Sequence, residues 1–454
     1  MPPAHRRGNM HHALRACQSM KRLLMIAYHF PPFAASSGIQ RTLSFARHLP
    51  AFGWQPLVLT AHPRAYPHRN SEHIDEPPEP TVVERAFALD AQRHLGLGGR
   101  YPSFLARPDR WTSWWYGAVP KGLGMIRRYR PDAIWSTYPI ATAHKIGATL
   151  HRLSGLPWIA DFRDPMVPAG FAGDAKTRRA IEGVEATAMH LASRVVCVTR
   201  GAARVYVERY ADLADGRMAV IENGFEEGIF RGFEEAKADR PGEQSRPLTL
   251  LHSGIVYPKE RDPSQFFQAL RRMLASGALK PGELRVRLRA PGHEAFLRNL
   301  ISTTGVDAIV ELAPSLPYRE ALEEMMSVDA LLVLQAAYCN QQVPAKLYEY
   351  LRCGRPVLAL TDPQGDTAGV MRQAGVDSIG RLDCADDVVR VLTNFLRRVR
   401  SATAPLPDRR YVESSTRHHR TAEFASLLDG LFDRPPVAPI ASRHAVERVN
   451  RMRA

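Results

Sequence analysis

LLHSGIVYPKERDPSQFFQAL, residues 250–270, reads as a strand, a glycine-containing loop and a helix, in that order. The apolar strand-like run begins at Leu248, and the apolar residues between Pro263 and Leu270 have helical spacing. A strand followed by a helix is the repeating unit of a parallel sheet that carries helices on its faces. The stretch therefore predicts an α/β fold, provided that the same unit recurs along the chain.

The unit does recur, on both sides of this stretch. Helical patterns such as Ile39–Leu49, Ala141–Leu153 and Lys176–Leu191 separate most of the apolar runs. The strand-like runs are Leu23–Ala27, Pro56–Thr60, Thr81–Ala86, Ala133–Ser136, Trp158–Asp161, Val195–Thr199, Met218–Glu222, Leu248–His252, Leu284–Leu288, Ala308–Leu312, Ala330–Gln335 and Val357–Leu360. This alternation predicts two Rossmann-like, doubly wound domains that face a central cleft, where a bridging ligand is expected.

Composition divides the chain into six segments. Residues 21–230 form the expected first domain, residues 231–246 a charged, apolar-poor linker, and residues 247–408 the second domain. A helix is expected within residues 409–432, from about Thr416. Residues 1–20 lack the apolar core of a secretory signal and are expected to be a disordered leader, and residues 433–454 a flexible tail.

The chain is basic, with a net charge of +15 over 454 residues. Such a balance fits nucleic acid, an anionic membrane surface or phosphorylated substrates. The sequence has no recognised nucleic-acid-binding motif and no apolar run long enough to span a bilayer. Its five cysteines are scattered without metal-ligand spacing, which favours reduced thiols and a cytoplasmic location, either free or at the inner face of the plasma membrane.

PAKLYEYLRCGRPVLAL, residues 344–360, predicts a helix from Pro344 and then a strand. Lys346 would lie in the first turn of that helix, where the helix dipole opposes a cation unless an anion such as phosphate binds there. Glu349 follows three residues later on the same side. Either the two form a surface salt bridge, or Lys346 binds phosphate while Glu349 accepts hydrogen bonds from ribose hydroxyls.

Two other loops carry residues that suit phosphate. In the first domain Ser36, Ser37 and Gly38 precede a helix, which indicates either an anion nest or a simple helix cap by Ser37. In the second domain Lys259 and Arg261 follow Gly254. They either hold a bridging diphosphate or belong to a solvated loop in which neighbouring acidic residues neutralise them.

Five stretches of the sequence, taken in order, resemble the retaining glycosyltransferases of family four, which have the GT-B fold. They are SSGIQRTLSFARHLPAFGWQPLVLT, LPWIADFRDP, AVIENGFEEGIF, LLHSGIVYPKERDP and VPAKLYEYLRCGRPVLA. The resemblance extends from about Lys21 to about Phe432. It is specific in the ordered set of motifs, and it is greatest with the bacterial branch that builds surface polysaccharides. It implies transfer of a sugar from a nucleotide-diphosphate donor, with retained anomeric configuration. No metal or other cofactor is expected, because the sequence has no Asp-x-Asp cluster and cationic side chains can neutralise the diphosphate.

The resemblance also implies roles for single residues. Gly38 matches the glycine-rich loop near the donor diphosphate, and Gly254 matches the glycine of the second-domain loop. Arg261 stands where the family usually has a diphosphate-binding lysine. Lys346 belongs to a PxKLxEY variant of the branch, and Glu349 matches the acid that holds the ribose.

Three residues depart from the family pattern. Gln341 replaces the first acid of the paired motif and is a candidate contact to the donor sugar. Ile255 replaces the arginine that usually follows the glycine of the second-domain loop. Arg163, in ADFRD, replaces a histidine; we therefore treat Arg163, Asp164 and Lys346 as candidate catalytic residues, while Asp161 and its neighbours could instead form a structural ion pair.

The expected partners are a nucleotide sugar and a glycan or polyprenyl-linked acceptor, with no nucleic acid. The segment Pro108–Arg130 mixes three tryptophans with basic residues. It favours a helix whose aromatic face is buried in the first domain, and the alternative is a peripheral contact with an anionic membrane. Two other functions share these expectations: a non-hydrolysing nucleotide-sugar epimerase of the same fold, and a non-catalytic scaffold that binds nucleotide sugars.

Overall fold

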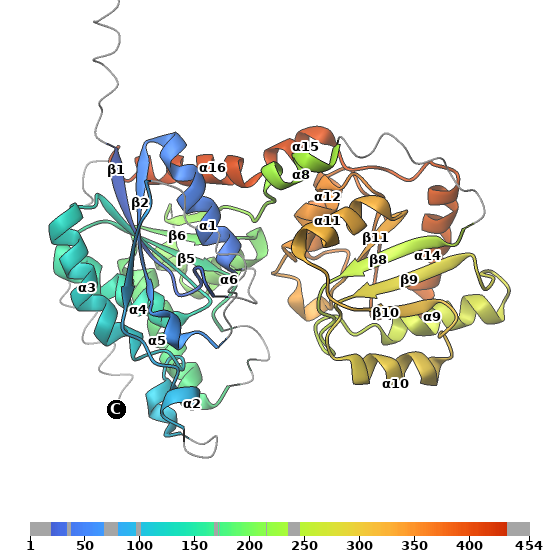
Figure 1. Cartoon of the computed structure of the whole chain (residues 1–454), viewed down its shortest axis with the longest axis horizontal. Coiled ribbons are helices and arrows are strands. Elements are labelled where there is room, and N and C mark those ends of the chain that lie inside the picture. The colour runs from blue at the N-terminus through green and yellow to red at the C-terminus, as the bar shows by residue number, and fades with distance from the viewer. Residues whose placement is uncertain are drawn as a thin grey trace, which may run out of the picture.

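The structure is a computed structural model that describes residues 20–33, 38–67, 80–96, 101–167, 171, 173–214, 216–234 and 246–433. Residues 1–19 of the expected leader, Ser36 and Ser37, most of the expected linker, and residues 434–454 of the tail lie outside these ranges. Figure 1 shows two α/β domains side by side, each built on its own sheet. The predicted fold of two Rossmann-like domains is therefore confirmed.

The first domain contains seven parallel strands in the order β3-β2-β1-β4-β5-β6-β7. Its central strands are almost continuously apolar because helices cover both faces of the sheet. The strands are β1 Lys21–Ile26, β2 Trp54–Ala61, β3 Val82–Ala86, β4 Ala133–Thr137, β5 Trp158–Arg163, β6 Arg194–Cys197 and β7 Met218–Val220. The helices are α1 Gly38–His48, η2 Leu49–Phe52, η3 Pro63–Ala65, α2 Ala91–His94, η4 Ser103–Ala106, α3 Trp114–Tyr129, α4 Ala141–Ser154, α5 Ala175–Leu191, α6 Arg200–Arg209 and α7 Ala211–Ala214.

The second domain contains six parallel strands in the order β10-β9-β8-β11-β12-β13. The short strand β13 at its edge was not predicted, because two residues give no periodicity to detect. The strands are β8 Leu248–Ser253, β9 Leu284–Arg289, β10 Val310–Ala313, β11 Ala330–Leu334, β12 Val357–Leu360 and β13 Ile379–Gly380. The helices are α9 Ser264–Ala275, α10 Glu294–Thr304, α11 Tyr318–Ser327, η6 Ala337–Cys339, α12 Lys346–Arg352, α13 Asp366–Gln373, α14 Ala385–Arg400 and α15 Arg409–Ser414.

The expected linker begins too early. Helix α8, Glu227–Glu234, continues four residues into the segment 231–246. Phe230 and Phe233 of this helix are buried in an apolar cluster formed with residues of the second domain. The helix forms because these aromatic side chains gain from burial, although the surrounding sequence is charged.

Two chain segments connect the domains, and they lie against each other. The backbone of Phe225 is paired with the segment around Thr416, since Arg417 N donates to the carbonyl O of Phe225 at 2.9 Å. A Cβ on Gly224 would lie 2.3 Å from the carbonyl O of Ser415. Only a residue without a side chain permits this close approach.

The C-terminal helix belongs to the first domain. The sequence predicts one helix within 409–432; the structure has α15, beside the second domain, and α16, Arg417–Asp429, above the first domain (Figure 1). Thr416 caps α16 by accepting from His419 N. Phe424 and Leu428 are fully buried in the core of the first domain, and the Phe424 ring stacks on Phe45 with centroids 4.5 Å apart.

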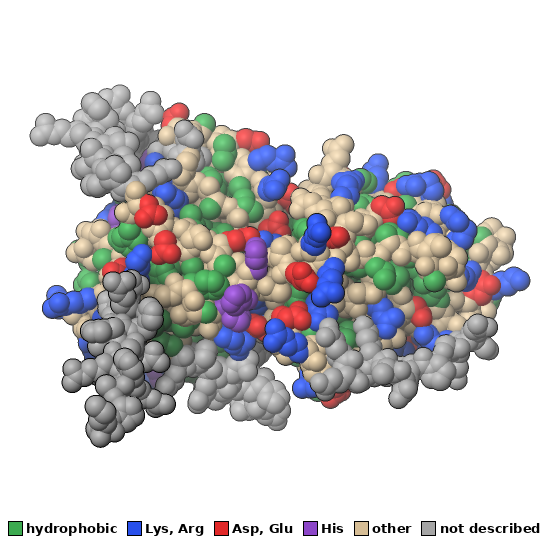
Figure 2. All heavy atoms as spheres, turned by 90° about the horizontal axis from the view of Figure 1, so that it is seen from above, with side chains coloured by type: hydrophobic (Ala, Val, Ile, Leu, Met, Phe, Trp, Pro, Cys, Tyr) green, Lys and Arg blue, Asp and Glu red, His purple; other side chains and the backbone are tan. Residues whose placement is uncertain are grey.

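The tryptophans of Pro108–Arg130 pack against the first domain, as favoured from the sequence. Trp114 is fully buried, while Trp111 and Trp115 are partly buried against the same core. Within the described part of the chain, none of the helices combines the length and hydropathy required to cross a bilayer. On the face seen in Figure 2, Lys and Arg side chains are mixed with Asp and Glu across the middle of the molecule. Much of the positive charge on this face therefore has acidic neighbours.

Candidate active site between the two domains

A cavity of about 360 Å³ lies between the domains. Four of the predicted site residues line it: Arg163, Arg261, Lys346 and Glu349. A second cavity of about 210 Å³ shares Arg163 and Arg261 with the first and adds Asp164. The other residues that line the larger cavity are Gln40, Arg41, Ser44, Phe45, Glu222, Asn223, Gly224, Tyr318, Pro344, Ala345, Arg417 and Arg420.

Lys346 is the first residue of α12, so the helix begins two residues later than predicted, and Pro344 lies in the preceding turn. Nζ of Lys346 lies 3.2 Å from Nε2 of His252 and donates to the carbonyl O of Ser253. Burial lowers the pKa of Lys346 well below its ordinary value, and the nearby Arg261 lowers it further. A buried cation with a lowered pKa gains from any anion that enters the cavity.

Gly254 lines neither cavity, but its conformation makes room for Lys346. Its φ is +104°, which side chains rarely permit, and a Cβ there would lie 2.9 Å from Nζ of Lys346. Gly254 thus leaves the space that the candidate cation occupies. Lys259, the other cation of this loop, is exposed and lines neither cavity.

Arg261 lies in both cavities. Its Nη1 donates to the carbonyl O of Ile255, and its guanidinium lies 5.3 Å from the ring centroid of Tyr257. Burial lowers the pKa of Arg261. Ile255, the residue that departs from the family pattern, therefore helps to hold Arg261 through its backbone.

Glu349 projects into the larger cavity one helical turn after Lys346. Oε1 of Glu349 accepts a hydrogen bond from the hydroxyl of Tyr318 at 2.7 Å. Burial raises the pKa of Glu349, while this hydrogen bond and the charges of Arg417 and Lys346 oppose the rise. Lys346 and Glu349 contact different partners and do not form an ion pair, so the alternative of a surface salt bridge between them is wrong.

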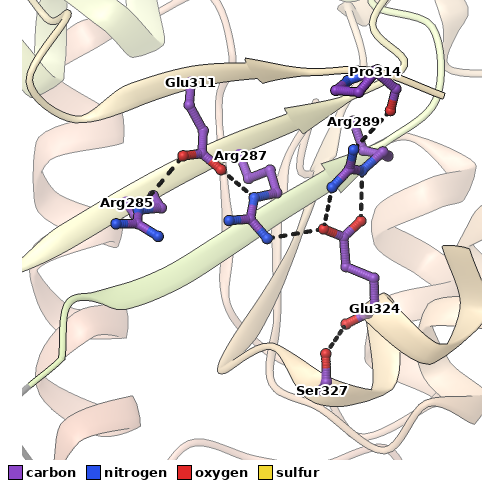
Figure 3. Close-up of polar contacts among 7 residues, drawn as sticks. All are labelled: Arg285, Arg287, Arg289, Glu311, Pro314, Glu324 and Ser327. Carbon is purple, nitrogen blue, oxygen red and sulfur yellow. Dashed lines mark hydrogen bonds and ion pairs between the residues drawn. The ribbon is translucent and has the colours of Figure 1, made fainter. Parts of the chain in front are cut away.

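Tyr318 is held in place by a network at the edge of the second sheet. Glu324 of α11 accepts from Arg287 and Arg289 of β9, with Nη2 of Arg289 at 2.6 Å from Oε1 (Figure 3). Arg287 also pairs with Glu311 of β10. Because α11 begins at Tyr318, anchoring this helix to the sheet also fixes the tyrosine beside Glu349.

Arg163 and Asp164 reach the cavities from the carboxyl end of β5. Arg163 has a left-handed backbone conformation, with φ +60°, and its Nη1 donates to the carbonyl O of Tyr138 at 3.4 Å. Its Nε is buried without a hydrogen-bond partner among the described residues. Burial raises the pKa of Asp164, although Arg163 opposes this. Backbone strain and an unpaired buried donor are typical of functional positions.

Asp161 is structural. Its carboxylate, fully buried, pairs with Arg41 of α1, with Nε and Oδ2 2.8 Å apart. Arg41 also donates to the carbonyl O of Glu222 in the first of the two connecting segments. The sequence indicated an ion pair between Asp161 and its neighbours, but the partner in the structure is Arg41, which is 120 residues away.

Gly38 and Gln341 line neither cavity. Gly38 is the buried first residue of α1, and Gln40 and Arg41 of the same turn line the cavity. The carbonyl O of Gln341 accepts from the hydroxyl of Thr199 in the first domain at 2.7 Å. The backbone of Gln341 therefore joins the domains, and the neighbouring Gln342 lines the smaller cavity instead.

Helix α16 contributes two arginines that sequence reasoning missed. Arg417 donates to Oε1 of Gln40 at 2.8 Å, and Arg420 pairs with Oε2 of Glu222 at 2.9 Å. No sequence signal places them in the site, because it is the return of the chain to the first domain that brings them there. Among the described residues, no group of three or more His, Cys, Asp and Glu side chains could hold a metal ion.

Comparisons with known proteins agree with this architecture. Residues 37–224 match the family model of the glycosyl transferase 4-like domain, whereas no curated protein sequence matches the chain. Sucrose-phosphate synthase from Thermosynechococcus elongatus is similar in structure, with a TM-score of 0.63 at 14% identity over 91% of this chain and 99% of that one.

Two further solved structures have this fold. HepE from Anabaena, in complex with UDP, gives a TM-score of 0.58 at 13% identity over 90% of this chain and 100% of that one. Trehalose 6-phosphate synthase from Burkholderia multivorans gives 0.58 at 11% identity over 91% and 99%. The chain therefore has the GT-B fold, and its residues 37–224 match the glycosyl transferase 4-like domain.

Proposed function

We propose that the protein transfers a sugar, with retained configuration, from a nucleotide-diphosphate donor to a glycan or lipid-linked acceptor, in the synthesis of a bacterial surface glycan. The observation that carries this proposal is the arrangement of Lys346, Arg261 and Glu349 around one cavity. Two cations and a carboxylate on the same side of a cavity suit the diphosphate and the ribose of a nucleotide.

The second domain would hold the donor. Lys346 and Arg261 would neutralise the charge that grows on the departing diphosphate, which is electrostatic stabilisation of a leaving group. Glu349 would accept from the ribose hydroxyls in place of Tyr318. A leaving phosphate oxygen would take the proton of the acceptor hydroxyl, so the step needs no separate base.

The first domain would contact the sugar and the acceptor. Arg163 and Asp164 face the donor side across the smaller cavity, where Gln342 supplies an amide. Closure of the domains over the ligands would exclude water, which otherwise competes with the acceptor hydroxyl. In this arrangement Gln342 takes the sugar contact that the sequence suggested for Gln341.

Binding is the first test of this proposal. UDP is the leading probe, because the related HepE structure contains it; GDP, ADP, TDP and their sugar conjugates complete a thermal-shift panel. A ligand that binds only the folded protein raises the melting temperature. We expect one nucleotide family to do so, and transfer from its sugar conjugates to follow.

Variants separate the roles of the two key side chains. Lys346→Ala should weaken a nucleoside diphosphate about tenfold or more and leave the nucleoside nearly unchanged, because hydrogen bonds to charged groups contribute about 1.5–3 kcal/mol. Glu349→Ala should weaken both ligands alike. Lys259→Ala, at an exposed lysine of the loop that carries Arg261, is the control and should bind normally.

Each alternative function gives its own result. Isomerised nucleotide sugar in the absence of any acceptor would indicate an epimerase. Binding without transfer or hydrolysis would indicate a scaffold, and well-folded protein that no nucleotide stabilises would contradict the proposal.

Contact with an anionic membrane is an additional part of the proposal for a lipid-linked acceptor. Exposed Tyr116, Arg127 and Arg128 on α3 support it. Purified protein should then sediment with vesicles that contain anionic phospholipid and not with neutral ones.

A further inference from the structure

His252 is a fully buried histidine at the end of β8, where a polar side chain requires a reason. Its Nδ1 lies 2.9 Å from the carbonyl O of Leu332 on the neighbouring strand β11. A carbonyl oxygen only accepts, so Nδ1 carries the ring hydrogen of the neutral imidazole, and its lone pair is on Nε2. The contact with the backbone of β11 therefore fixes the Nδ1–H tautomer of His252.

The lone pair of Nε2 faces Lys346. Nζ of Lys346 lies 3.2 Å from Nε2, and it also donates to the carbonyl O of Ser253. An ammonium has three hydrogens, and these two contacts use two of them. The third is left for a ligand in the cavity that Lys346 lines.

Burial and the nearby charges keep His252 neutral, as a hydrogen-bond acceptor, and Lys346 acts as the donor. Burial lowers the pKa of His252 well below its ordinary value, and the charges of Lys346 and Arg261 lower it further. The imidazole is therefore neutral and acts as an acceptor. Two other ionisable side chains act on Lys346: the charge of Arg261 lowers its pKa, and the carboxylate of Glu349 favours the ammonium form.

We propose that His252 is a positioning residue for Lys346: its Nε2 accepts a hydrogen bond from the ammonium and holds it where it selects a nucleoside diphosphate over the nucleoside. This inference rests on the proposed function, in which Lys346 binds the donor diphosphate. It adds a residue that touches no ligand and acts through the lysine.

The binding test compares UDP with uridine by calorimetric titration, or the nucleotide pair that the thermal-shift panel identifies. His252→Phe keeps the bulk of the ring but removes the acceptor, and it should weaken UDP about tenfold or more while leaving uridine unchanged. His252→Gln retains an oxygen that accepts, and it should restore part of the loss. His144→Phe, at a fully buried histidine of the first domain outside both cavities, should change neither ligand.

A second measurement needs no nucleotide. Trace labelling with acetic anhydride at a series of pH values, read by mass spectrometry, gives the pKa of Lys346 in the free protein. Loss of the acceptor destabilises the ammonium, so His252→Phe should lower this pKa further. His144→Phe should leave it as in the wild type.

The outcomes are separable. Equal weakening of UDP and uridine by His252→Phe, or an unchanged pKa of Lys346, would overturn the positioning role. If wild-type protein prefers no nucleoside diphosphate, the proposed function fails, and the labelling result still decides whether His252 holds Lys346.

Discussion

At the scale of the residue, the site depends on charges that burial makes unfavourable until a ligand arrives. Lys346 begins α12, where the helix dipole opposes a cation, and Arg261 lies in the same cavity. Two acceptors, His252 and the Ser253 carbonyl, partly offset this. A diphosphate would supply the missing negative charge, so the free site is prepared for an anion.

The pH dependence of binding should follow from two opposite shifts. The pKa of Glu349 is raised, so uridine affinity should fall as pH decreases, beginning above the range in which an ordinary glutamate is protonated. The pKa of Lys346 is lowered, so UDP should show an additional loss as pH rises and the ammonium loses its proton. Calorimetric titrations of uridine and UDP at a series of pH values measure both the loss of affinity at low pH (the acid limb) and the additional loss for UDP at high pH (the alkaline limb).

Two variants provide the controls for these profiles. Glu349→Gln should flatten the acid limb and bind weakly throughout, and Lys346→Met should remove the alkaline limb for UDP. Identical profiles for uridine and UDP in the wild type would contradict separate roles for the carboxylate and the ammonium.

Only part of the site could be predicted from sequence. Lys346 and Glu349 lie on one helix, so their common direction follows from helical spacing. Tyr318 and His252 enter through other elements, and their contacts with Glu349 and Lys346 depend on how those elements pack. Local patterns carry no information about such distant pairs.

At the scale of the element, α16 is the clearest case of a helix whose place the sequence did not reveal. Its pattern predicts a helix from about Thr416, and the structure confirms one. The helix packs on the first domain because the chain crosses back from the second domain to the first. This packing buries Phe424 beside Phe45. The helix thereby completes the first domain and brings Arg417 into the cavity.

Phe424→Ala should destabilise the first domain strongly. Removing a fully buried phenyl ring leaves a cavity and typically costs about 3–5 kcal/mol. The matched control is Phe432→Ala, because that ring is 45% exposed. Differential scanning calorimetry should show a large fall in melting temperature for the first variant and a small one for the second; equal shifts would mean that α16 adds little to the core.

Strands with long apolar runs were predicted correctly, whereas the two-residue strand β13 and part of helix α8 were not. Every run proposed between Leu23 and Leu360 corresponds to a strand, because both faces of each sheet are covered and burial fixes the composition. Helix α8 was partly assigned to a linker, since its neighbours are charged and its buried face contains few residues. Whether a short helix or strand forms depends more on its burial against other elements than on the apolar pattern of its own residues.

At the scale of the whole molecule, the domains are held together on the side of the strand ends. Oδ2 of Asp366, in the second domain, accepts from the backbone N of Gly201 in the first at 2.8 Å. Thr199 donates to the carbonyl O of Gln341 beside it. These contacts lie next to the loop that leads to Lys346, so they link domain closure to the donor side.

Asp366→Ala should therefore favour a more open arrangement of the ligand-free protein. Hydrogen bonds to charged groups contribute about 1.5–3 kcal/mol, so closure should weaken by an amount of that order. Small-angle X-ray scattering should report a larger radius of gyration than for the wild type. Asp386→Ala, at a highly exposed carboxylate of α14, is the control; equal radii for all three proteins would contradict a role of Asp366 in closure.

The packing of α16 also has a consequence for the order in which the protein is made. Domains generally fold as the chain leaves the ribosome, beginning from the N-terminus. Here the core of the first domain includes Phe424 and Leu428, which are synthesised after the entire second domain. The second domain can therefore finish folding first, while the earlier-made sheet still exposes the apolar surface that α16 will cover.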